Sequence, residues 1–261
     1  MVLRAISVLG LGLLALVGCR ENDLPFEITA QDEGRTLVAV GVIDDTTPFI
    51  VEQALFTYPQ AETLILQFVP GSMNEEQNKV ASRLIRDHGL KTIVPSDGLV
   101  ASGGTAMFVA GKERVLEKGA CVGVHTWWVN GFGPSGDQLA PDDEEHDEYL
   151  EYYRDMGITP EFYWFGIRAA GSEDFHWMDR KEIETFGLET NVEPYKASLK
   201  NQPVFCDSRH DAGYDLRIEA RREEQSDARE AALERLAEVK ARRAAREAAE
   251  AAAENEASPA P

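Results

Sequence analysis

Three side chains in this sequence have the types needed for nucleophilic attack on a carbonyl group. Ser102 lies in the stretch ASGG, His125 closes the stretch GVH 23 residues later, and Asp174 lies in the stretch SEDF. Triad chemistry requires a hydroxyl, an imidazole that takes its proton, and a carboxylate that orients the imidazole. Each residue also has a structural interpretation, as a helix cap, a core histidine and a surface acid respectively. Their joint occurrence beside glycines favours an active site.

Glycines accompany the candidate nucleophile. Gly103 directly follows Ser102 at the start of an expected helix, and Gly71 stands where a second helix begins. The first N–H groups of a helix have no partner within the helix, so they are available to bind an anion. The main-chain N–H groups of Gly71 and Gly103 are therefore candidates for stabilising an oxyanion.

The elements that would position these residues alternate along the chain. Apolar, β-rich runs cover residues 36–43, 62–69, 91–94 and 121–127, and helical patterns cover 47–58, 73–88 and 101–110. A largely apolar strand such as 62–69 is typical of a sheet that is covered on both faces. This alternation predicts a layered α/β fold.

The segment from Leu66 to Trp128 resembles the proteolytic subunit of the Clp protease and signal peptide peptidase A, which share the crotonase-like fold. The resemblance rests on the stretches PGS at 70–72, VASGG at 100–104, AGK at 110–112 and GVH at 123–125, and it extends over residues 36–192. It is strongest to exported Clp-protease-like periplasmic proteins. The resemblance implies repeated β-β-α units and a serine peptidase acting on peptides or proteins.

Transferred by position, the resemblance makes Ser102 the nucleophile, His125 the general base and Asp174 the orienting acid. Gly71 and Gly103 would then supply the oxyanion N–H groups. Glu173 and Asp179 remain alternatives for the acid, because that loop can align with a shift. Ser72 departs from the second glycine of the family's Pro-Gly-Gly, and its side chain is expected to narrow the site.

The N-terminus has the pattern of an export signal. Arg4 precedes a short apolar run that ends in LVGC at 16–19. The run is shorter than the ~20 residues of a membrane span and fits a cleaved signal. The ending resembles the bacterial lipobox, which implies lipidation of Cys19. The export signal implies a protein of the cell envelope that faces the periplasm. Arg20 stands where an aspartate would indicate retention in the inner membrane, so the outer membrane is favoured.

These boundaries predict four parts of the chain. Residues 1–18 are the signal, 19–34 a polar tether, 35–205 the Clp-protease-like domain, and 206–261 an Ala-, Glu- and Arg-rich helical tail with a disordered end. The tail predicts a long helix with poorly kept heptads, so that a coiled coil is weak. Cys121 and Cys206 either form a disulfide in an oxidising compartment or remain two thiols, and both interpretations stay open.

Composition excludes several classes of function. The chain has 26 Lys and Arg against 46 Asp and Glu, a formal charge of −20, which argues against a nucleic-acid partner.

The GFGPSG stretch at 131–136 contains a proline where a dinucleotide site needs a helix, and no HExxH pattern indicates zinc. We expect neither cofactor nor metal. The aromatic residues between 149 and 165 are expected mostly in the core, with part of them available for a homo-oligomer.

Two functions from different classes remain. The first is a membrane-tethered serine hydrolase that acts through an acyl-enzyme. The second is a catalytically inactive Clp-like lipoprotein that binds a partner or serves as a scaffold.

Overall fold

The computed structural model describes residues 24–128, 133–190 and 206–213. The chain divides into two units, Met1–Cys206 and Asp207–Pro261. Of the second unit only residues 207–213 are described, and they are helical. The predicted long helix and disordered end of the tail therefore lie mostly outside the described residues. Within the described ranges, every helix is too short or too polar to cross a membrane.

The described part of the first unit contains a mixed eight-stranded sheet. The strands are β1 (Glu27–Gln31), β2 (Thr36–Val40), β3 (Thr63–Val69), β4 (Lys91–Val94), β5 (Leu99–Ala101), β6 (Arg114–Leu116), β7 (Cys121–Val124) and β8 (His176–Trp177). Their main order is β1-β2-β3-β5-β7-β8, and β4 joins β3 to β6. Only the outer pairs β1–β2 and β7–β8 are antiparallel, so the central strands end at a common edge.

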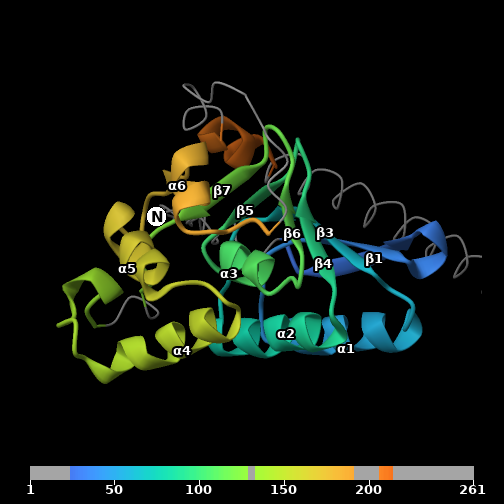
Figure 1. Cartoon of the computed structure of the whole chain (residues 1–261), viewed down its shortest axis with the longest axis horizontal. Helices are drawn as coiled ribbons and strands as arrows, with labels where there is room; N and C mark the ends of the chain where they lie inside the picture. The colour runs from blue at the N-terminus through green and yellow to red at the C-terminus, as the bar shows by residue number, and fades with distance from the viewer. Residues whose placement is uncertain (1–23, 129–132, 191–205, 214–261) are drawn as a thin grey trace, which may run out of the picture. The chain divides into compact units, whose positions relative to one another are not determined.

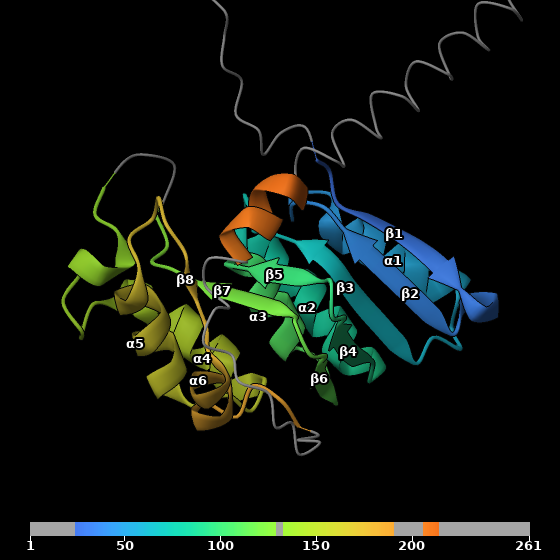
Figure 2. The same cartoon turned by 90° about the horizontal axis from the view of Figure 1, so that it is seen from above.

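Helices follow these strands. They are α1 (Thr47–Thr57), α2 (Glu75–His88), α3 (Gly103–Val109), α4 (Asp147–Asp155), α5 (Pro160–Ala169) and α6 (Arg180–Thr185), with short 3-10 turns η2 (Asp32–Gly34), η3 (Gly136–Gln138) and η4 (Glu144–His146). Figure 1 shows α1 and α2 side by side along one side of the sheet. Figure 2 shows α4, α5 and α6 gathered at the end of the sheet opposite to β1.

The element order confirms the predicted α/β class with β-β-α units. Two strands precede a helix in β1-β2-α1 and again in β4-β5-α3. The first half of β3 pairs with β4 and its second half with β5, so the sheet divides at this strand. Leu64, Leu66 and Phe68 are buried and alternate with partly buried residues along β3, so one face of the strand lies in the core and the other is less covered than the sequence suggested. Helix α3 is buried along its whole length and packs in the centre of this arrangement.

The predicted tether is shorter in the structure than residues 19–34. Glu27–Gln31 forms β1 and pairs in antiparallel register with β2, and the buried Phe26 belongs to the core. The strand was missed because only Ile28 and Ala30 of its five residues are apolar, so that their alternation is weak, and most of the strand is exposed. An edge strand of this kind is held by main-chain pairing to its neighbour. The domain therefore includes residues from 24 onward.

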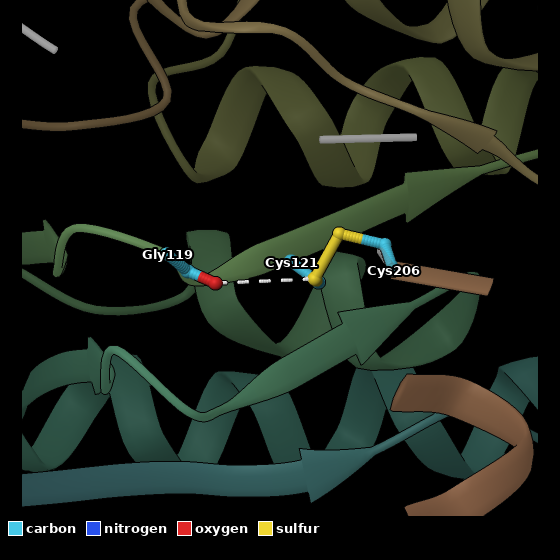
Figure 3. Close-up of a disulfide and its surroundings, with 3 residues drawn as sticks. All are labelled: Gly119, Cys121 and Cys206. Carbon is cyan, nitrogen blue, oxygen red and sulfur yellow. Dashed lines mark hydrogen bonds between the residues drawn. A yellow bond between two sulfur atoms is a disulfide. The ribbon is translucent and has the colours of Figure 1, made fainter. Parts of the chain in front are cut away.

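Cys121 and Cys206 form a disulfide, which settles the alternative that the sequence left open. Figure 3 shows the bond at the start of β7, beside the contact between Cys121 Sγ and the carbonyl oxygen of Gly119. Both cysteines are buried. The bond closes a separation of 85 residues, so it restricts the unfolded chain strongly.

Candidate active site

Ser102 occupies a sharp turn between β5 and α3. Its backbone has φ 51° and ψ −123°, a region that residues with a side chain rarely adopt. Such a conformation costs on the order of 1–3 kcal/mol and is found disproportionately at active sites. Hydrogen bonds on both sides hold it, because Ser102 N donates to the carbonyl oxygen of Gly123 at 3.0 Å and Thr105 N donates to Ser102 O at 2.9 Å. The turn presents the hydroxyl group at the carboxyl edge of the sheet.

Glycines allow the chain to pack closely around this serine. A Cβ on Gly104 would lie 1.9 Å from the carbonyl oxygen of Val69, so only glycine lets α3 approach β3 this closely. A Cβ on Gly71 would lie 3.9 Å from Ser102 Cβ. The structure thus brings Gly71 beside Ser102 and Gly103. Among the described residues, neither Gly71 nor Gly103 donates its main-chain N–H in a hydrogen bond.

Ser72 lies against the same turn. A Cβ on Gly103 would come 2.3 Å from Ser72 Cβ, so the Ser72 side chain fills space beside the nucleophile turn, as the sequence predicts. The cap of α2 is Asn74, whose side chain accepts a hydrogen bond from Gln77 N at 3.1 Å. Ser72 therefore packs against Gly103.

His125 follows β7, directly beside the Ser102 turn. Both residues line one pocket. Its ring lies 4.7 Å from the ring of Phe175, centroid to centroid. Burial lowers the pKa of His125, while main-chain groups of Ser172 and Gly171 and the charge of Glu173 act in the opposite direction. A neutral imidazole at neutral pH can accept a proton.

The two candidate catalytic groups share a pocket but are not hydrogen-bonded to each other. Among the described residues, no hydrogen bond joins the Ser102 hydroxyl group to His125, and His125 Nδ1 is buried without a hydrogen-bond partner. Hydrogen bonds of this kind are often long in free enzymes and shorten when substrate binds.

The three candidate acids occupy different positions. The pairing of Val124 with His176 brings the connection before β8 past His125, and Thr126 N donates to Ala170 O at 3.0 Å. On this connection Glu173 is the acid whose charge acts on His125. Asp174 makes no hydrogen bond to the imidazole, and its N–H closes a turn onto Gly171 O at 3.3 Å.

Asp179 has a structural role. Its side chain accepts a hydrogen bond from Glu182 N, and the Glu182 side chain accepts one from Asp179 N, which makes a capping box at the start of α6. Of the three acids considered from the sequence, Glu173 therefore has the strongest electrostatic link to His125.

The pocket walls contain residues that the sequence analysis did not select. Glu75 and Lys79 come from one face of α2, and the aromatic walls come from α4 and α5, including Tyr149, Tyr152, Tyr153, Phe162 and Tyr163. Glu75 and Lys79 lie four residues apart on an amphipathic helix, and this spacing is the only sequence signal for them. The prediction that the aromatic residues are mostly core agrees with the burial of Tyr152, Phe162 and Tyr163.

Lys79 is held on the rim of the pocket by two contacts. Its Nζ lies 2.5 Å from Glu148 Oε2 and 4.8 Å from the ring centroid of Tyr149. In the part of the chain that the structure describes, no three His, Cys, Asp or Glu residues are grouped to hold a metal ion.

Comparison with known proteins gives similarity to solved structures. No protein-family model and no curated protein matches the chain. A serine-to-alanine mutant of the 1510-N membrane-bound stomatin-specific protease is 15% identical, with a TM-score of 0.43, over 61% of this chain and 79% of that one. A lysine-to-alanine mutant of the same protease, in complex with a substrate peptide, is 16% identical, with a TM-score of 0.39, over 59% and 75% of the two chains.

Proposed function

We propose that this protein is a serine hydrolase, a peptidase, tethered to a membrane by lipid at Cys19. The observation that carries the proposal is the strained backbone of Ser102, which lies beside Gly71 and lines one pocket together with Gly103 and His125. The resemblance of the surrounding stretches to Clp-like peptidases supports a peptide or protein as the substrate.

The mechanism follows from the positions of these groups. His125 takes the proton of Ser102 as Oγ attacks the substrate carbonyl carbon, and the N–H groups of Gly71 and Gly103 stabilise the oxyanion. The peptide C–N bond then breaks, and His125 gives the proton to the departing amine. Water, deprotonated by the same imidazole, hydrolyses the acyl-enzyme and releases Ser102. The negative charge of Glu173 favours the imidazolium that forms in both steps.

A second candidate function is a binding or scaffold protein with a degraded site. The observation that favours it is the absence, among the described residues, of an acid hydrogen-bonded to the buried Nδ1 of His125. Without an orienting acid a serine protease loses about 10⁴ in rate.

Labelling of Ser102 with a fluorophosphonate separates the two functions. We expect one phosphonyl group per chain, located on Ser102 by peptide mass, and no label on a Ser102→Ala variant. Ser208, which lies in the described helical segment of the other unit, is the matched control: a Ser208→Ala variant should label like the wild type. An unlabelled wild-type chain that melts cooperatively would favour the binding protein.

The tether is part of the proposal and has its own test. A Cys19→Ala variant is expected to keep its N-terminal segment and to incorporate no labelled fatty acid, because the lipidated thiol is missing. The mass of the N-terminal peptide and radiolabelling of the cell envelope measure this. The Cys121–Cys206 disulfide supports an oxidising compartment such as the periplasm. Normal maturation of Cys19→Ala would contradict lipidation, while fractionation of the wild type tests the preference for the outer membrane.

A further inference from the structure

An acid lies at the end of the pocket where negative charge would develop. Glu75 is the first residue of α2 and lines the pocket together with Ser102 and Gly103. Its Oε1 is 2.9 Å from the position that a Cβ on Gly103 would occupy. The carboxyl group thus packs against the residue whose N–H would stabilise the oxyanion.

Contacts hold this carboxyl group in place. The buried side chain of Asn78 donates to Glu75 Oε2 at 3.3 Å and to the carbonyl oxygen of Gly103 at 2.9 Å. The amide of Asn78 therefore links the acid to the turn that follows Ser102. Ser72 also lies within hydrogen-bonding reach of the Glu75 carboxyl group.

Several titratable groups share the surroundings of Glu75. Those that face it or its neighbours are Lys79 on α2, Glu148, Tyr149, Tyr152 and Tyr153 on α4, and His125 after β7. Lys79 is the lysine of this set, and its ammonium group is bound to Glu148. Its charge is therefore shared between two carboxylates.

Burial raises the pKa of Glu75, while hydrogen bonds from Asn78, the charge of Lys79 and a hydrogen bond from Ser72 act against this rise. The neutral acid therefore persists to higher pH than for an exposed glutamate. An ionised carboxylate in the same pocket would repel the oxyanion, and in a poorly solvated site that repulsion is large. A neutral carboxyl group removes the repulsion and can donate a hydrogen bond.

We infer that Glu75 controls the charge of the oxyanion end of the pocket and that Ser102 reacts fastest when Glu75 is neutral. This inference rests on the proposed hydrolase function and deepens it. The direction in which the rate changes with pH follows from His125 and Glu75. As pH rises, loss of the proton from His125 increases the rate, and loss of the proton from Glu75 decreases it. The wild-type profile is therefore bell-shaped, with Glu75 responsible for the limb at higher pH.

The test is the rate of phosphonylation by a neutral fluorophosphonate, measured on the full chain from about pH 4 to about pH 9. Glu75→Gln keeps the size and hydrogen-bonding capacity of the side chain without its charge. We expect this variant to lack the limb at higher pH and to react on the order of tenfold faster than the wild type at neutral pH. Glu76→Gln, an exposed neighbour on the same turn of α2, makes the same change of charge outside the pocket and should retain the wild-type profile.

The outcomes separate this inference from the proposed function. Labelling that depends on Ser102 but has the same pH profile in the wild type and Glu75→Gln would overturn the inference and leave the hydrolase intact. An equal effect of Glu76→Gln would also overturn it, because the cause would then be the charge of the whole helix end. If Ser102 is unlabelled in all variants at every pH, the hydrolase is wrong, and the role of Glu75 falls with it.

Discussion

Replacement of His125 by alanine is expected to slow hydrolysis by Ser102 about 10⁴- to 10⁶-fold. In the proposed mechanism the imidazole, which lines the pocket with Ser102, is the base, and an alcohol without a base is a poor nucleophile at neutral pH. The measurement is kcat/KM for a peptide substrate, together with the rate of fluorophosphonate labelling. His88→Ala is a suitable control, because His88 is exposed at the end of α2.

The pH dependence gives the same prediction a second readout. Because burial lowers the pKa of His125 below its usual value of 6.5, the imidazole is neutral and active at neutral pH. The rate should fall as pH decreases through this lowered pKa, and the midpoint of the fall should lie below 6.5. If His125→Ala retains more than about a tenth of the activity, the base is another group of the pocket.

Replacement of Arg114 by alanine is expected to lower the free energy of unfolding by about 3–5 kcal/mol. Arg114 is 6% exposed, and its guanidinium group donates to the carbonyl oxygens of Leu188 at 2.7 Å, Gly187 at 3.2 Å, and Met156 and Gly111 at 3.4 Å each. These carbonyls follow the ends of α6, α4 and α3. One guanidinium group thus binds main-chain carbonyl oxygens after the C-terminal ends of three helices, where positive charge is favoured.

In the alanine variant these carbonyl groups would lack a donor, and a cavity would replace the arginine side chain. Burial lowers the pKa of Arg114 to about 10, with a contribution from the charge of Arg86, and no carboxylate among the described residues pairs with it. Urea titration should show the loss as a lower midpoint, and Tm should fall by roughly 10 °C. Arg83→Ala, which removes a half-exposed pair with Asp155, should cost at most about 1 kcal/mol. A similar small loss for Arg114→Ala would mean that water replaces the guanidinium at the helix ends.

The turn at Ser102 was predictable because its structural requirements are local. Ser102 needs a turn that bends sharply between a strand and a helix, and Gly103 and Gly104 permit the close packing of that turn. Gly71 could be added because parallel strands end at the same edge of a sheet, so residues after successive strands come together. The apolar strand at 63–69 and the amphipathic helix at 75–88 were likewise visible in short-range hydrophobic patterns.

Other features depend on contacts between segments distant in sequence. The bond between Cys121 and Cys206 requires two positions 85 residues apart to meet. Such a pair has no local pattern, because distance in space leaves no periodic trace in the sequence. The identity of the acid whose charge acts on His125 also depends on the tertiary structure, because it follows from the path of residues 171–174 past β7.

The sequence by itself determined the α/β class, the position of the serine turn and the glycines that surround it, because backbone conformation and hydrophobic periodicity act over a few residues. The tertiary structure decided which side chains share the pocket with Ser102. Glu75 reaches it from α2 and the tyrosines from α4, while Arg114 unites the ends of three helices. Charge and desolvation act through space, so the burial that shifts the pKa of Glu75 and His125 exists only once these segments have packed together.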